Sequence, residues 1–136
     1  MVNKILKKAV FMLAAAAAFT AQAADVETLP SGVRIEHVMR GSGVKPTADS
    51  TVTVQYRGTL VATGAEFDSV YGEGTQASFG LRKVIPCWTE GMQHIAVGGV
   101  ATVICPAHTA YGARGVGSRI PPNSDLRFDV AMLNVR

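Results

Sequence analysis

The sequence lacks the short motifs that mark the common classes of enzyme site. It contains no P-loop, no G-x-S-x-G, no H-E-x-x-H and no G-x-G-x-x-G segment that follows a predicted strand. Residues 112–117 are rich in glycine, but they follow no βα pattern and lead into a Pro-Pro pair, which indicates a loop. Nucleotide-binding, serine-hydrolase and zinc-peptidase sites of the usual kinds are therefore excluded.

The chain also has little net charge once its first residues are set aside. Lys and Arg number 13 and Asp and Glu number 10, but Lys4, Lys7 and Lys8 lie at the start and no acidic residue precedes Asp25. Removing those three lysines leaves ten positive charges against ten negative ones. Binding to phosphates needs a surplus of positive charge on the folded domain, so we expect no nucleic-acid partner.

Residues 1–23 have the three-part pattern of a secretory signal peptide. The lysines form a positive segment, residues 9–19 form an apolar run of eleven residues, and Ala21-Gln22-Ala23 is an A-x-A cleavage site. The alternative, an uncleaved anchor, needs about 20 apolar residues. We expect cleavage between Ala23 and Ala24, export across the inner membrane to the periplasm, and no membrane span in the mature chain.

Cysteine is scarce, with Cys87 and Cys105 the only two in the chain. In an oxidising compartment such a pair favours a disulfide over free thiols, although the sequence does not show that the two residues meet. A zinc site with His94 and His108 would lack any closely spaced C-x-x-C or H-x-x-x-H pair. A Cys–His nucleophile meets the same objection, so we expect no metal and no cofactor.

The chain from residue 24 onward is long enough for one domain of ordinary size. Residues 24–32 are polar and contain Pro30 and Gly32, which predicts a short flexible lead-in to a domain over residues 33–136. The apolar run over residues 100–105 predicts a strand in the middle of a sheet. Alternating apolar residues predict further strands at residues 33–37, 51–56 and 126–132.

The helical signal is short. Pro86 suits a first turn, and apolar residues recur at Trp88, Met92 and Ile95 before Gly98-Gly99 stops the pattern. One short helix packed on a mostly antiparallel sheet is the economical architecture, which places the chain in the α+β class.

Seven motifs gather aromatic and aliphatic residues beside the predicted loops. They are Val54-Gln55-Tyr56-Arg57-Gly58, Glu66-Phe67-Asp68-Ser69, Val84-Ile85-Pro86-Cys87-Trp88-Thr89-Glu90-Gly91-Met92, Val97-Gly98-Gly99, Ala110-Tyr111-Gly112, Ile120-Pro121-Pro122-Asn123 and Leu126-Arg127-Phe128-Asp129-Val130. Core packing would explain any one of these residues alone. Their joint order and spacing, from about residue 32 to residue 135, resemble the FKBP-type peptidyl-prolyl cis-trans isomerases, tacrolimus-binding immunophilins, of the exported bacterial type.

The resemblance implies a twisted antiparallel sheet wrapped around the helix, with an apolar cavity floored by Trp88 that would hold a proline ring. The implied activity is rotation of X-Pro bonds in proline-containing unfolded or exported polypeptides. Rotation has a barrier of about 20 kcal/mol because resonance keeps the amide planar. Resonance is lost in the twisted amide, whose atoms carry less charge, so a water-poor cavity favours it over the planar form.

The resemblance also implies roles for individual residues. The Ile85 N–H and the Tyr111 hydroxyl would donate hydrogen bonds to substrate carbonyls. Asp68 would polarise the surroundings of the twisted carbonyl or orient Tyr56, and together these four are the expected catalytic residues. Considered alone, Asp68 would be a turn-capping carboxylate. The expected substrate-binding residues are Phe67, Phe79, Val84, Trp88, Ile120 and Phe128.

A chaperone or peptide-binding module on the same fold, without catalysis, is the alternative function, because exposed apolar pockets bind chains without turnover. Tacrolimus-type macrolides are candidate ligands, although Val116 and Arg119 replace residues that often contact ligand. Residues 24–32 are too short for the helical dimerisation arm of some exported relatives, so we expect a monomer.

Overall fold

A computed structural model describes residues 25–72 and 74–136. The predicted signal peptide and its cleavage site lie outside these residues. The strands are β1 (Val26–Thr28), β2 (Arg34–Met39), β3 (Thr51–Leu60), β4 (Glu66–Val70), β5 (Ala77–Gly80), β6 (Val100–Cys105) and β7 (Leu126–Val135). The helical elements are α2 (Pro86–Gly91) and the 3₁₀ turns η1 (Met92–His94) and η2 (Ala107–Thr109).

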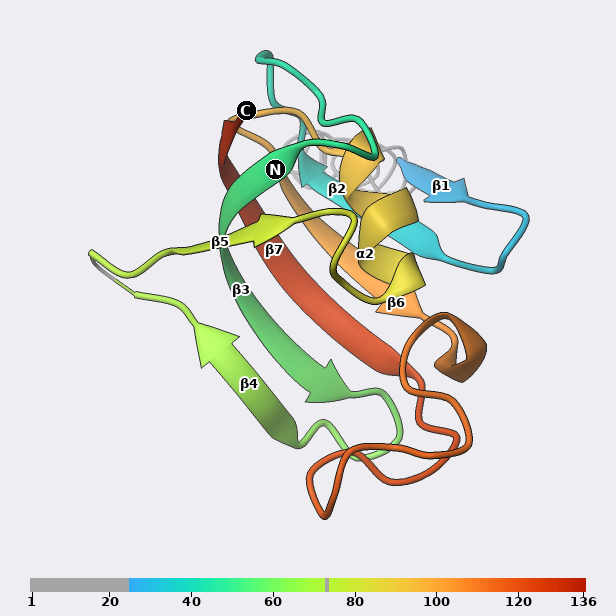
Figure 1. Cartoon of the computed structure of the whole chain (residues 1–136). Helices are drawn as coiled ribbons and strands as arrows, with labels where there is room; N and C mark the ends of the chain where they lie inside the picture. Colours follow the sequence, from blue (N-terminus) through green and yellow to red (C-terminus); the bar gives the residue numbers. More distant parts are fainter. Residues whose placement is uncertain (1–24, 73) are drawn as a thin grey trace, which may run out of the picture.

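The strands form one antiparallel sheet that curves behind the short helix α2 (Figure 1). The strand order is β1-β2-β6-β7-β3-β4, and β5 pairs with β3 beside β4. The prediction of a central strand is confirmed, because β6 lies between β2 and β7. The α+β architecture with a sheet wrapped around one helix is also confirmed. Within residues 25–72 and 74–136, no helix has both the length and the apolar character to cross a membrane.

Buried and less buried side chains alternate along the two longest strands, β3 and β7, and the buried ones form much of the core. In β3 the side chains of Val52, Val54 and Tyr56 are buried, while Thr53 and Gln55 between them are only partly covered. In β7 the buried positions also alternate, as the sequence predicts. Because successive side chains of a strand point to opposite faces, each strand gives one face to the core beneath α2. The buried members of β7 are Leu126, Phe128, Val130 and Met132.

The helix is shorter than the apolar spacing suggests. α2 ends at Gly91 and the chain tightens into η1 instead of continuing to Gly98. A Cβ atom added at Gly91 would lie 3.2 Å from Cγ1 of Val103, so this glycine allows close packing on β6. Glycine also weakens a helix relative to alanine. The apolar spacing therefore continues through a 3₁₀ turn, and Ile95 is already extended.

The flexible lead-in predicted for residues 24–32 is wrong for residues 26–28, which form β1 and pair with β2. The Glu27 carboxylate accepts hydrogen bonds from Nε2 of His37 at 2.5 Å and from Nδ1 of His94 at 3.0 Å. Arg40 binds the adjacent Asp25 through two nitrogens. Polar side chains that suggest solvent exposure in the sequence therefore hold this strand to β2 and η1.

Replacing Glu27 with Gln should destabilise the fold in a pH-dependent way. Partial burial raises the pKa of Glu27, but the hydrogen bonds and charges of His37 and His94 outweigh it, so the pKa lies below its ordinary value. A carboxyl with a lowered folded-state pKa stabilises the protein above its unfolded-state pKa, and this contribution is lost as the pH falls through the folded-state value. We expect Glu27→Gln to lower the free energy of unfolding by about 1 kcal/mol at pH 6, a value that already allows for solvent screening of the partly exposed Glu27 carboxylate.

Denaturant unfolding at pH 6 and at pH 3 measures this difference, which should shrink at the lower pH. Glu36→Gln is a matched control, because Glu36 pairs with Arg34 on the exposed surface of the neighbouring strand. Its effect should stay within about 0.5 kcal/mol. An equal loss for Glu27→Gln at both pH values would contradict the assignment.

Candidate active site

A cavity of about 460 Å³ opens between the start of α2, the sheet and the loop after η2. This volume lies in the range typical of small-molecule and peptide side-chain sites. Nine of the ten site residues predicted from the sequence line it. Its lining residues are Tyr56, Phe67, Asp68, Phe79, Lys83, Val84, Ile85, Trp88, Tyr111 and Phe128.

Trp88 is the centre of an aromatic cluster. Its ring meets Tyr56, Phe79 and Phe128 edge to face, with ring centroids 5.1, 5.0 and 5.2 Å apart. Phe67 extends the cluster through a similar contact with Phe128 at 5.6 Å. Edge-to-face pairs are favourable beyond the area they bury. The indole is 5% exposed, and among the described residues its Nε1 has no hydrogen-bond partner although it is buried.

Gly58 lets this cluster close over the sheet. A Cβ atom at this position would lie 2.6 Å from Cζ of Phe67 and 3.0 Å from Cε1 of Phe128. Gly58 pairs with Phe128 of β7 on one side and with Asp68 of β4 on the other. Any side chain here would push Phe67 away from the cavity. Close packing of the aromatic rings therefore explains why the first motif ends in glycine.

Asp68 and Tyr56 form the polar edge of the cavity. The Tyr56 hydroxyl donates a hydrogen bond to Oδ2 of Asp68 at 2.5 Å, and the N–H of Ser69 donates to Oδ1 at 2.9 Å. Burial, the hydrogen bond to Asp68 and the carboxylate charge all raise the pKa of Tyr56. Tyr56 therefore stays protonated as a donor, and the contact is the one that orientation of Tyr56 by Asp68 would require.

Besides Nε1 of Trp88, two further donors of the lining residues have no hydrogen-bond partner in residues 25–72 and 74–136: the N–H of Ile85 and the hydroxyl of Tyr111. The N–H of Ile85 precedes α2 and donates to no backbone oxygen there, while its carbonyl accepts from Trp88 and Thr89. The hydroxyl of Tyr111, on a side chain that is 40% exposed, makes no hydrogen bond within the same residues. Both groups are free to donate to a carbonyl of a bound chain.

Ile120 and Lys83 differ from the sequence prediction. Ile120 does not line the cavity; it is 5% exposed and pairs with Val116 inside the loop before β7. Lys83 lines the cavity without belonging to any predicted motif. Its only sequence signal is its place two residues before Ile85.

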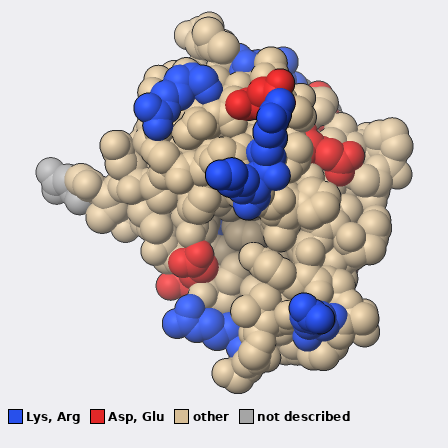
Figure 2. All heavy atoms as spheres, viewed as in Figure 1, with Lys and Arg blue, Asp and Glu red and all other residues tan. Residues whose placement is uncertain are grey.

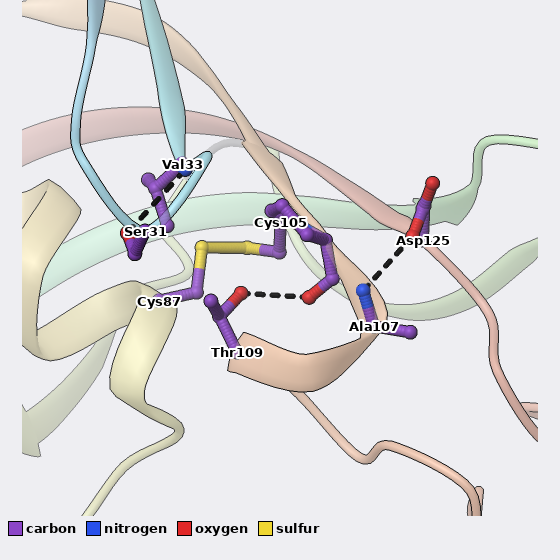
Figure 3. Close-up of a disulfide and its surroundings, with 8 residues drawn as sticks. Ser31, Val33, Cys87, Cys105, Ala107, Thr109 and Asp125 are labelled. Carbon is purple, nitrogen blue, oxygen red and sulfur yellow. Dashed lines mark hydrogen bonds between the residues drawn. A yellow bond between two sulfur atoms is a disulfide. The ribbon is translucent and has the colours of Figure 1, made fainter.

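The predicted disulfide is confirmed. Cys87 in the first turn of α2 is bonded to Cys105 at the end of β6, with Cα atoms 5.6 Å apart, and both residues are fully buried (Figure 3). The chain after β6 is held beside the bridge, because the Thr109 hydroxyl donates to the Pro106 carbonyl and the Ala107 N–H donates to Asp125. The bridge thus fixes the helix that carries Trp88.

The curved sheet, the short helix and the aromatic cavity between them define an FKBP-type domain. The family model for FKBP-type peptidyl-prolyl cis-trans isomerases matches residues 42–133. The chain belongs to this family.

Among curated proteins, the chain is similar to FkpA of Escherichia coli K12, with 45% identity over 111 residues, and to probable FkpA of Neisseria meningitidis, with 42% identity over 110 residues. These matches cover 82% and 81% of this chain but only 40% of each relative. The chain therefore spans about two fifths of the length of these curated relatives.

Solved structures give the same assignment. The crystal structure of FkpA from Escherichia coli matches with a TM-score of 0.77 and 40% identity, over 98% of this chain and 63% of that one. A peptidyl-prolyl cis-trans isomerase from Pseudomonas syringae matches with a TM-score of 0.75 and 32% identity, over 82% of this chain and 81% of the other.

Loss of the disulfide should lower stability by about 3 kcal/mol, because the bridge restricts the unfolded chain. The test compares denaturant unfolding of the native protein, the reduced protein and the double variant Cys87→Ala, Cys105→Ala. Reductant should destabilise the native protein and leave the double variant unchanged, which makes that variant the control for other effects of the reductant. Equal stability of the oxidised and reduced proteins would contradict this role.

Proposed function

We propose that the protein is a peptidyl-prolyl cis-trans isomerase that accelerates rotation of X-Pro bonds in polypeptides. Family membership supports this activity. The observation that carries it is an aromatic cavity lined by two donors, the N–H of Ile85 and the hydroxyl of Tyr111, that have no partner in the part of the chain that the structure describes.

The cavity favours the transition state through its polarity. In the planar amide, resonance places partial charges on oxygen and nitrogen, and rotation removes that resonance at a barrier of about 20 kcal/mol. Aromatic walls around Trp88 exclude water from a bound proline ring, so they stabilise the less polar twisted amide more than the planar one. Rotation breaks no covalent bond, so the reaction needs no nucleophile.

The polar groups hold the substrate chain while the bond turns. Donation from Ile85 and Tyr111 to two substrate carbonyls would fix the chain at the cavity. The bound chain would then be held in an orientation in which the X-Pro bond can rotate. Asp68 acts as a positioning residue, because both of its oxygens accept hydrogen bonds and one of them holds the Tyr56 hydroxyl.

Exported, unfolded chains are the proposed substrates, and the periplasm is the proposed location. The leader pattern of residues 1–23 supports export. The bond between Cys87 and Cys105 supports an oxidising compartment, where disulfides persist.

The decisive experiment follows the cis-to-trans relaxation of a short chromogenic X-Pro peptide with and without the protein. Acceleration that tacrolimus abolishes would establish both the activity and the cavity as its site. A folded protein that gives no acceleration would overturn the proposal. Suppression of client aggregation by that same protein would then favour the peptide-binding alternative.

Tyr111→Phe should lower kcat/KM for this peptide about fivefold, the effect of one lost hydrogen bond. Tyr71→Phe is the matched control: Tyr71 is an exposed tyrosine that does not line the cavity, so its loss of a hydroxyl should leave the rate unchanged. Relaxation rates at several enzyme concentrations give kcat/KM for both variants. Equal rates for Tyr111→Phe and the native protein would contradict the role of the Tyr111 hydroxyl as a donor to the substrate.

A further inference from the structure

Lys83 is a charged cavity residue that the proposed reaction does not use. Among the described residues that line the cavity it is the one cation, and it lies in the turn between β5 and α2. No carboxylate of residues 25–72 and 74–136 lies within 4 Å of its ammonium group. Its neighbour Arg82 is different, because it pairs with Asp49 at 2.6 Å and does not line the cavity.

The acidic side of the cavity does not neutralise Lys83. Asp68 lines the same cavity but forms no ion pair with Lys83, and its oxygens accept from Tyr56 and from the Ser69 N–H. Arg119 reaches the same strand as Asp68, since its guanidinium donates to the Phe67 carbonyl at 3.2 Å. In Figure 2 positive side chains lie above and below the hollow at the centre of this face, with a negative group at its left edge.

We propose that the cavity prefers polypeptides with an Asp or Glu side chain next to the proline, and that Lys83 causes this preference. The inference rests on the proposed binding of X-Pro chains at this cavity. Lys83 and Ile85 line the same cavity and are two residues apart, so a chain held by the N–H of Ile85 would bring a flanking carboxylate toward the ammonium group. The alternative use of Lys83, donation to a substrate carbonyl, would give no preference for charge.

The expected size of the preference for acidic peptides follows from the exposure of Lys83. Lys83 is exposed, so water and salt screen the attraction. We expect a preference of about fivefold at low salt, and a smaller one at about 0.5 M salt, where the screening length falls to a few ångströms.

Trp88 provides a direct readout of binding, because it is the single tryptophan of the chain and lines the cavity. Its fluorescence is titrated with tryptophan-free peptides that carry Glu, Gln or Lys before the proline, and with a second set that carries them after it. In at least one set, the Glu peptide should bind about fivefold more tightly than the Gln peptide, and the Lys peptide more weakly. The ratio of the Glu and Gln dissociation constants is the quantity compared between variants.

The variants separate charge from general damage to the site. Lys83→Gln should bring the ratio to about one, Lys83→Arg should retain it, and Lys83→Glu should reverse it. Arg82→Gln removes the same charge from the adjacent position and should leave the ratio unchanged. Equal affinities of the native protein for Glu and Gln peptides, or an unchanged ratio in Lys83→Gln, would overturn the inference.

Isomerisation measured on the same peptides distinguishes this inference from the proposed function. Preferential binding of Glu peptides without acceleration would overturn catalysis and leave the charge preference standing. Acceleration of all peptides with equal affinity would overturn the preference alone. No fluorescence change together with no acceleration for any peptide would overturn both.

Discussion

The packing of Trp88 against the sheet is the contact on which both the fold and the cavity depend. Its ring touches Tyr56 of β3, Phe79 of β5 and Phe128 of β7, so one side chain joins the helix to three strands. Full burial of a large aromatic residue is worth about 3 kcal/mol. Nε1 of this ring is buried without a partner among residues 25–72 and 74–136, which costs about 1–3 kcal/mol, so the aromatic contacts must offset that cost. The same ring lines the cavity, and stability and binding therefore share one residue.

The position of that ring is constrained from the other side of the helix. A helix of six residues is too short to persist alone, so tertiary contacts must hold α2. Cys87 ties it to the end of β6, and Gly91 allows it to approach Val103 of the same strand. Adjacent residues thus have separate tasks: Cys87 anchors the helix to the sheet, and Trp88 fills the space between the helix and the cavity.

The sequence predicts those parts of the structure that depend on regular patterns. Alternation identifies the buried faces of β3 and β7, because a strand has a period of two and one covered face. Nine of the ten residues that the resemblance assigns to the site line the cavity. The strand β1 is missed because its stability comes from Glu27 meeting His37 and His94, which are distant in sequence. Ile120 and Lys83 lie in irregular segments, where no period gives the direction of a side chain.

At the polar edge of the cavity, Tyr56 keeps its proton near neutral pH. The pKa of Tyr56 is raised, away from neutral pH, by burial and by its contact with Asp68. Amide rotation transfers no proton, so the proposed reaction gains nothing from a group that titrates near neutral pH. A constant site discriminates between chains through features of the chains themselves: the fit of the proline ring against Trp88, and the charge that its neighbours bring toward Lys83.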